Sequence, residues 1–172
     1  MAFIPRGTLE TDGAPVLRSQ IITGSITVTE QDSVKLSSGF IALGTTGALV
    51  FGHVMGIVTK EGVGLETTGA AGAAIGSFVG AYTTASTNTT VAQVKAVVDV
   101  SKYELYSGAE SGTIGTTTGS NLAGYTQDLS DQATLSETSA LTTTGQYMGW
   151  GVDPLKTTQA IVNIYESQVF GV

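Results

Sequence analysis

Short apolar runs separated by turn residues extend along most of this chain. In the stretch IITGSITVT, Ile26 and Val28 alternate with Ser and Thr, a period of two that is typical of a half-buried strand. Gly24 marks a candidate bulge in that strand. The runs SVKL, GFIAL and ALVFGHVMGIVT follow at short spacing, separated by Ser-Ser-Gly and Gly-Thr-Thr-Gly turns. This pattern predicts a succession of short strands joined by tight turns.

Two later patterns extend the same reading. The segment GIVTKEGVGLE is typical of a hairpin whose turn lies at Lys60-Glu61-Gly62. In TVAQVKAVVDV, the alternation places Val94, Ala96 and Val98 on one face, and the density of β-branched residues favours a strand over a helix.

The most strand-like run in the chain is QAIVNIYESQVF, near its end. Both faces of this run carry apolar side chains, so we expect it to be covered on both sides, either centrally in a sheet or by a neighbouring subunit. Val162 and Ile164 share one face and are the inward candidates. Since barrels remove exposed edges by pairing a late strand with an early one, we expect this run to close the sheet.

The domain organisation predicted from the sequence is simple. Residues 1–20 contain Pro5 and Pro15 together with two glycines, and we expect an extended N-terminal arm without a regular element. Residues 21–172 are expected to form a single β-rich domain. Residues 67–90 are expected to be an insertion or loop within it, rich in Gly and Ala.

Gly72, Gly76 and Gly80 recur at four-residue spacing in that insertion. This GxxxGxxxG pattern can let membrane helices approach closely. However, the apolar part runs only from about residue 69 to residue 82, and a spanning helix needs about 20 apolar residues. A Gly-rich surface excursion is therefore favoured over a membrane helix.

Composition strengthens the all-β prediction. The chain has 172 residues, of which 12% are charged, against about 25% in ordinary globular domains. Thr, Ser and 23 Gly residues replace the missing charge, and these are strand and turn formers and poor helix formers. The fold class predicted is a small β-barrel or sandwich.

Charge and cysteine content exclude several functions. The net charge is −7 and Lys plus Arg number only 7, with no basic cluster to release counterions from phosphates, so we expect no nucleic-acid partner. The same acidic balance argues against an anionic membrane. The absence of cysteine excludes disulfides, thiolate metal sites and cysteine nucleophiles.

Candidate catalytic or metal-binding groups are few. His53 is the only histidine, no Gly-x-Ser-x-Gly elbow accompanies it, and a structural histidine at a turn or in a partly buried site is favoured. Asp128, Asp131 and Glu137 form the densest acidic group, but their spacing does not match an EF-hand, so a surface loop with solvated carboxylates is favoured. A carboxylate pair for glycoside hydrolysis stays open, although Trp150 is the only tryptophan. We therefore expect no enzymatic activity, no cofactor and no metal.

Three segments carry a family resemblance. DSVKLSSGFIALGTTGALVFGHVMGIV resembles the opening of the small β-barrel head decoration proteins of tailed bacteriophages. SNLAGYTQDLSDQATLSE and GWGVDPLKTTQAIVNIYESQVFG resemble the ends of phage virion structural proteins, in which a Gly-Val-Asp-Pro turn precedes the last strand. The resemblance implies a β-barrel or β-tulip-like fold and a place on the virion surface after synthesis in the host cytoplasm. It also implies a major capsid protein as partner.

The arm is the candidate capsid-binding segment, because apolar anchors without a regular element are well suited to ordering on a partner. A frayed terminus is the alternative. We also expect a homotrimer, since subunit association covers two-faced apolar strands. The alternative function is a receptor- or carbohydrate-binding module, for which Trp150 beside Tyr147 is the candidate surface. The capsid-binding candidates in the arm are Phe3, Ile4, Arg6, Val16, Leu17 and Arg18.

Overall fold

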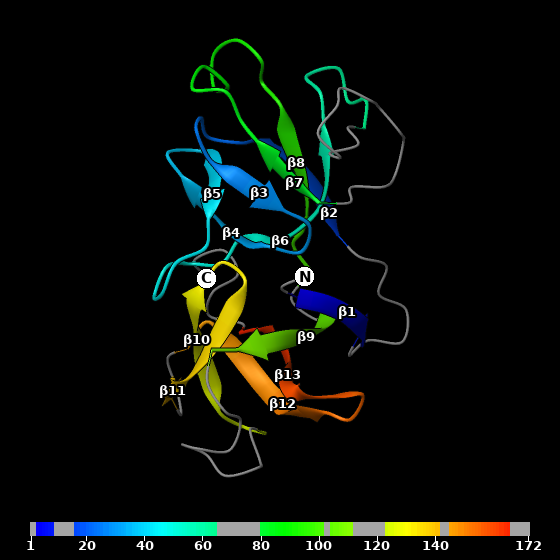
Figure 1. The fold of residues 1–172 in the computed structure, drawn as a ribbon, viewed down its shortest axis with the longest axis vertical. Coiled ribbons are helices and arrows are strands. Elements are labelled where there is room, and N and C mark those ends of the chain that lie inside the picture. The colour runs from blue at the N-terminus through cyan, green and yellow to red at the C-terminus, as the bar shows by residue number, and fades with distance from the viewer. Residues whose placement is uncertain are drawn as a thin grey trace.

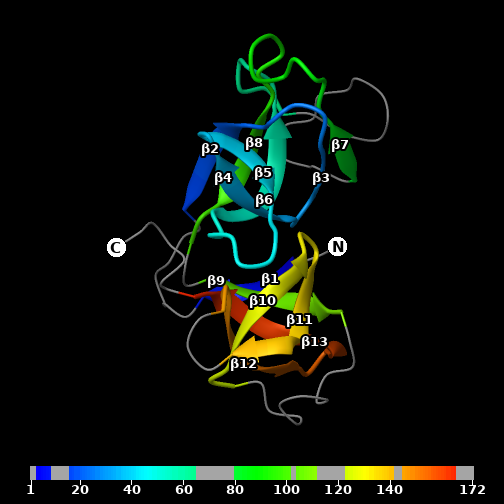
Figure 2. The ribbon, with the colours of Figure 1, turned by 90° about the vertical axis from the view of Figure 1, so that its left-hand side faces the viewer.

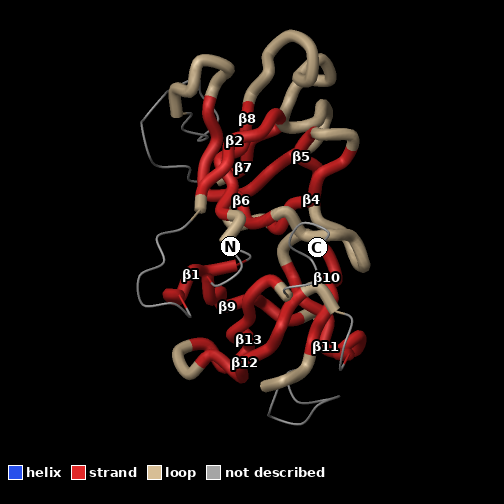
Figure 3. The backbone as a smooth tube through the Cα atoms, turned by 180° about the vertical axis from the view of Figure 1, so that it is seen from behind, coloured by secondary structure: helices blue, strands red, loops and turns tan. Residues whose placement is uncertain are grey.

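The computed structural model of the chain describes residues 3–8, 16–64, 80–101, 104–111, 123–141 and 145–165. These residues form β-strands, turns and loops and contain no helix, which confirms the predicted all-β class (Figure 3). The strands are arranged in two units that lie end to end along the long axis (Figure 1). We call them the first unit, built by β2 to β8, and the second unit, built by β1 and β9 to β13.

The first unit is built on a five-stranded sheet with the order β2-β8-β6-β4-β5. A parallel bridge between Ile22 and Ile41 brings the β5 edge back beside the end of β2, so the sheet curls on itself. β3 and β7 pair separately as a two-stranded ribbon. The strands are β2 (Leu17–Ile21), β3 (Thr27–Thr29), β4 (Ser33–Ser37), β5 (Phe40–Leu43), β6 (Gly52–Val58), β7 (Ala81–Thr83) and β8 (Lys95–Asp99).

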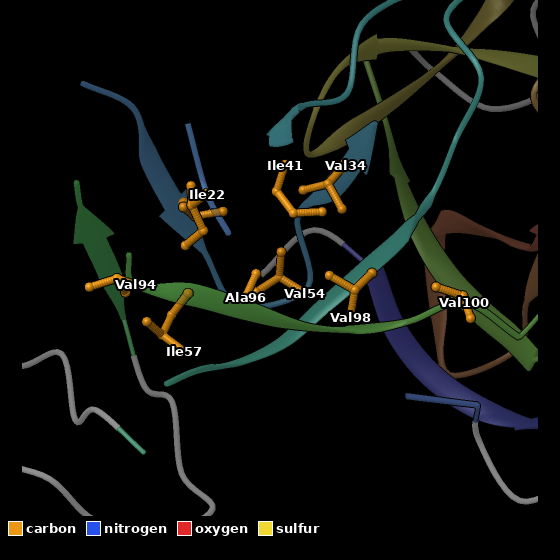
Figure 4. Close-up of a cluster of buried hydrophobic side chains, with 10 residues drawn as sticks. Ile22, Val34, Ile41, Val54, Ile57, Val94, Ala96, Val98 and Val100 are labelled. Atoms are coloured by element: carbon orange, nitrogen blue, oxygen red, sulfur yellow. The ribbon is translucent and has the colours of Figure 1, made fainter. Parts of the chain in front are cut away.

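Small and β-branched side chains fill the interior of the first unit (Figure 4). Val94, Ala96 and Val98 are all buried, which confirms the face predicted from their alternation. Each fully buried side chain of valine or isoleucine size stabilises the fold by about 1.5–3 kcal/mol relative to exposure. The buried cluster comprises Ile22, Val28, Val34, Ile41, Val54, Ile57, Val94, Ala96, Val98 and Val100.

The second unit is barrel-like. Strand pairings run from β9 through β11, β10, β12 and β13 and return to β9. The β9–β11 link is parallel and consists of two register pairs, so the ring is not fully closed. β1 pairs in antiparallel register with the edge of β9 opposite β13. The strands are β1 (Phe3–Thr8), β9 (Glu104–Glu110), β10 (Thr126–Asp131), β11 (Thr134–Leu141), β12 (Tyr147–Asp153) and β13 (Lys156–Ile164).

The last described strand, β13, lies between β12 and β9. Val162 and Ile164 are buried, as predicted for the inward face of this run. β13 therefore joins the last hairpin of the second unit to β9, which follows directly after the first unit. The buried cluster comprises Phe3, Val50, Tyr106, Leu129, Leu135, Tyr147, Ala160, Val162 and Ile164.

The expectation that residues 1–20 lack regular structure is wrong where the chain is described. β1 belongs to the second unit, whereas β2 opens the first, so the chain enters the second unit, builds the first and then returns (Figure 2). Pro5 is tolerated because β1 is an edge strand that, in the described part of the chain, pairs only with β9, and the register shifts between Pro5 and Gly7. A lone proline in an edge strand does not end it.

The region around Gly24 also differs from the prediction of one bulged strand. Gly24 lies in a turn between β2 and β3, and a Cβ there would approach the Ser86 carbonyl oxygen to 2.4 Å. The close approach of two backbones therefore requires glycine at this point.

The predicted hairpin turn is confirmed. The Gly62 N–H donates to the Thr59 carbonyl at 3.0 Å, and Val58 forms an antiparallel bridge with Gly64. Leu65, predicted on the return strand, lies outside the described residues, as do Gly72 and Gly76. Within the described ranges, no helix combines the length and apolar character needed to cross a membrane.

Candidate functional site

The only histidine lies at the junction of the two units, fully buried in strand β6. Its Nε2 is 2.9 Å from the Tyr147 hydroxyl on β12, and that hydroxyl donates to Ser33 Oγ at 2.9 Å. Because the single phenol proton is given to Ser33, Nε2–H of His53 must be the donor to Tyr147. Nδ1 is then a bare acceptor, and it has no hydrogen-bond partner in the described part of the chain.

Electrostatics keep this histidine neutral. Burial lowers the pKa of His53 to about 3. Burial likewise raises the pKa of Tyr147 above its usual range. Ser33 meets Tyr147 rather than the imidazole, and all three side chains are buried, so the arrangement is not a nucleophile–base pair open to substrate. Its effect is to join the two units through a chain of hydrogen bonds, and His53 is a structural residue more deeply buried than the sequence predicted.

Two further contacts fasten the junction. The Tyr106 hydroxyl on β9 donates to Asp99 Oδ2 on β8 at 2.6 Å, and burial together with this carboxylate raises the pKa of Tyr106. The Gln146 amide donates to the carbonyls of Thr45 and Ala48, and its oxygen accepts from the Leu129 N–H at 2.8 Å. Buried polar groups that are paired in this way restrain the relative orientation of the units.

Three of the six arm candidates lie in β1 and serve the second unit. The Phe3 side chain is fully buried, stacked on Tyr147 with ring centroids 5.1 Å apart, and it is therefore a core residue. Ile4 is partly buried on the same strand. Arg6 donates through Nε and Nη2 to Asp153 Oδ2, at 3.0 and 2.7 Å.

Asp153 is the residue of the Gly-Val-Asp-Pro turn that makes this pairing possible. Its Oδ1 accepts from the Leu155 N–H at 2.8 Å, which fixes the β12–β13 hairpin, while Oδ2 accepts from Arg6 and from Ser107. Burial would raise the pKa of Asp153, but the hydrogen bonds from Ser107, Leu155 and Arg6 outweigh it and hold that pKa below its usual value. The carboxylate is thus charged and internally neutralised.

The other three arm candidates, Val16, Leu17 and Arg18, remain exposed, and we call them the β2 patch. Val16 and Leu17 are 45% and 47% exposed. Their backbone is nevertheless held: the Val16 N–H donates to Ser101 Oγ at 2.7 Å, and the Val16 carbonyl accepts from the Val100 N–H at 2.9 Å. Among the described residues, β2 pairs in its sheet with β8 alone, and the β4–β5 hairpin reaches its outer edge only from Gln20 onward, so that edge carries no strand along residues 17–19. The patch combines fixed apolar side chains, one guanidinium and a free strand edge.

The acidic group expected in a loop lies instead in strands. Asp128 and Asp131 are in β10 and Glu137 is in β11, and the side chain of Glu137 lies outside the described set. The Asp131 carboxylate accepts from the Ala133 N–H at 2.8 Å at the hairpin turn. In the described ranges, no three histidine or acidic residues gather in a way that could hold a metal ion.

Trp150 and Tyr147, the candidate surface of a binding module, lie on opposite faces of β12. Tyr147 points into the core, whereas Trp150 is half exposed on the other side of β12. The indole N–H donates to Asn163 Oδ1 on β13 at 2.7 Å, so the ring is held against the hairpin with its polar atom already satisfied.

Sequence reasoning missed Asp99, Tyr106 and Gln146, all of which fasten the junction. Their partners lie on other strands, and no local pattern marks them.

Comparisons with protein-family models, with curated proteins and with solved structures found no match.

Proposed function

We propose that this protein is a structural virion protein that binds the outside of an assembled tailed-phage capsid shell and stabilises it. The resemblance of its strand-and-turn segments to head decoration proteins supports the proposal. So does the mechanical character of the molecule, in which two β-rich units are fastened by buried hydrogen bonds at His53, Tyr106 and Gln146. The partner is a major capsid protein, and the protein acts as a homotrimer at three-fold positions.

The observation that carries the proposal is the β2 patch. Exposed apolar side chains on a fixed backbone bind a partner with little loss of conformational entropy. Leu17 and Arg18 project from opposite faces of β2, so a partner strand added at this edge can contact both. The free edge of β2 can accept an extended segment of the capsid protein as an added strand, with Leu17 entering a pocket between strands. Arg18 is one of only two arginines in a chain of net charge −7, and it suits an acidic rim on the partner.

A matched pair of substitutions tests this docking surface. Leu17→Glu and Leu36→Glu change leucines of the same unit that are 47% and 44% exposed, and only Leu17 belongs to the patch. With expanded, undecorated shells of the virus that encodes the chain, we expect Leu17→Glu to lower co-sedimentation at least tenfold and Leu36→Glu to leave it unchanged. Equal binding by both variants would overturn the β2 patch as the dock. Light scattering should give three times the 17.5 kDa chain mass, and a monomer would remove the trimer from the proposal.

A second candidate, a carbohydrate-binding module, is favoured by one observation. Trp150 presents a half-exposed ring whose N–H is already bonded to Asn163, so it offers an apolar face of fixed orientation. Aromatic faces of this kind pack against the C–H faces of sugars. Retention of the protein on a glycan panel, lost in Trp150→Ala, would support this function over capsid binding.

A further inference from the structure

β1 occupies a specific slot in the second unit while the seven strands after it build the first. Its Phe3 ring stacks on Tyr147 and contacts His53 with ring centroids 4.7 Å apart. Gly108, the register partner of Phe3, leaves room for the ring: a Cβ there would lie 2.9 Å from Phe3 Cε1. The slot therefore accepts an aromatic side chain at this position.

The slot also binds the side chain of Arg6, three positions after Phe3. Arg6 reaches Asp153, which is buried and held by Ser107 and the Leu155 N–H. The Arg6 guanidinium gives this carboxylate a charged partner, and without it only neutral donors would remain. We define the β1 slot as the β9 edge from Glu104 to Gly108, the Phe3 pocket and Asp153. An aromatic followed by an arginine on an extended strand is the chemistry that fits it, and the chain itself carries that sequence.

We propose that the β1 slot is also an interface between copies of this chain, in which β1 of one copy occupies the slot of its neighbour. The inference deepens, and rests on, the self-association part of the proposed function. Every contact of β1 is the same within one copy or between two, so the exchange conserves them. Whether β1 fills its own slot or a neighbour's slot then depends on the connection between β1 and β2 and on the local concentration of copies, which is high where copies are arrayed on a shell.

The connection between β1 and β2 gives β1 a wide reach. Eight residues separate Thr8 from Leu17, and an extended chain of that length reaches roughly 30 Å. Copies that each carry a charge of −7 repel one another, so a self-interface needs specific complementarity. The pairing of Arg6 with Asp153 supplies it. Head-to-tail donation of one strand per copy gives a closed trimer when successive copies are related by a three-fold rotation.

Mixed single-cysteine variants test the exchange directly, because the natural chain has no cysteine. Ile4 and Ser107 are register partners across β1 and β9. One full-length variant carries Ile4→Cys and another Ser107→Cys, and the two are refolded together at high concentration and oxidised. We expect a disulfide-linked heterodimer on a non-reducing gel. A mixture of Ile4→Cys with Ser130→Cys, an exposed position outside the slot, should give none.

A chain with both cysteines at Ile4 and Ser107 controls for geometry. If it closes an internal disulfide while the mixture stays unlinked, β1 fills only its own slot and the proposal is overturned. Complementation gives an independent readout. Phe3→Ala removes the side chain that fills the slot, and Gly108→Val blocks the slot. If strands exchange, a refolded mixture of the two variants should contain a species that is more stable to unfolding than either variant alone. If the unfolding curve of the mixture is only the sum of the curves of the two variants, exchange is contradicted.

Neither the disulfide assay nor the complementation assay contains capsid shells, so each can fail or succeed independently of the shell-binding test of the capsid proposal. Shell binding without exchange removes only this inference. Exchange without shell binding removes only the capsid role.

Discussion

Replacing Phe3 with alanine tests whether the N-terminal strand is part of the folded core. The ring is fully buried and lies against Tyr147, His53 and Tyr106, with centroids 5.1, 4.7 and 6.5 Å away. An unstructured arm would lose nothing measurable from this substitution. A core residue loses both the transfer free energy of the ring and the contacts around the cavity it leaves.

The expected magnitude follows from that environment. Truncation of a buried Phe to Ala typically costs about 3–5 kcal/mol. The upper half of that range applies, because two aromatic neighbours each add about 0.5–1.5 kcal/mol beyond area burial. The cavity also lies between two fastened units, which limits its collapse. Against a total stability of roughly 5–15 kcal/mol, this loss is large.

Equilibrium unfolding in urea measures the loss. The matched control is Ile4→Ala, a partly buried residue of the same strand that should cost under about 2 kcal/mol. Equal and small effects of the two substitutions would show that β1 is not docked and would refute the reasoning.

Three further predictions concern other parts of the molecule. Ile164→Ala should cost about 2–5 kcal/mol, since the side chain is buried in β13, and an unchanged melting temperature would place it on the surface. Arg6→Ala should destabilise by about 3 kcal/mol, because it leaves the Asp153 carboxylate buried without its cation; a denaturation midpoint equal to that of the natural chain would contradict this. Burial lowers the pKa of His53 from 6.5 to about 3, so the unfolded chain binds a proton at this residue more readily than the folded protein does. The contribution of neutral His53 to the free energy of unfolding is therefore complete above pH 6.5. It falls by about 1.4 kcal/mol per pH unit as the pH drops from 6.5 toward 3. Burial raises the pKa of Asp32 to about 6, so this residue changes the free energy of unfolding with pH in the opposite direction. The natural chain is therefore compared with His53→Gln, in which Asp32 is unchanged. Parallel stability profiles of the two proteins from pH 6.5 to 4 would count against a buried neutral histidine.

Local patterns identified most of the strands in the first unit and the inward face of β13. Alternation of apolar and polar residues correctly predicts which side chains are buried, because the period of a strand is fixed by its geometry. The buried residues predicted in this way are Val94, Ala96, Val98, Val162 and Ile164. The turn at Lys60-Glu61-Gly62 is equally local. Features of this kind depend on neighbours within a few residues.

The features that escaped prediction depend on distant partners. Arg6 and Asp153 lie 147 positions apart, and nothing near Arg6 indicates a buried carboxylate. The sequence places Phe3 in a binding arm because Pro5 argues against a strand, yet an edge position tolerates a missing N–H. The sequence favours a structural role for His53, but its partner Tyr147 comes from another unit and no local pattern identifies it.

The central claim is that this chain binds and stiffens a capsid shell, and one measurement tests it most directly. Purified protein is titrated onto expanded, undecorated shells of the tailed phage that we propose encodes it, and bound protein and the temperature of shell rupture are followed together. The account predicts saturable binding to the outer surface and a rupture temperature that rises with occupancy, both lost in Leu17→Glu and kept in Leu36→Glu. Shells that retain no protein, or that rupture at the same temperature when saturated, would contradict it.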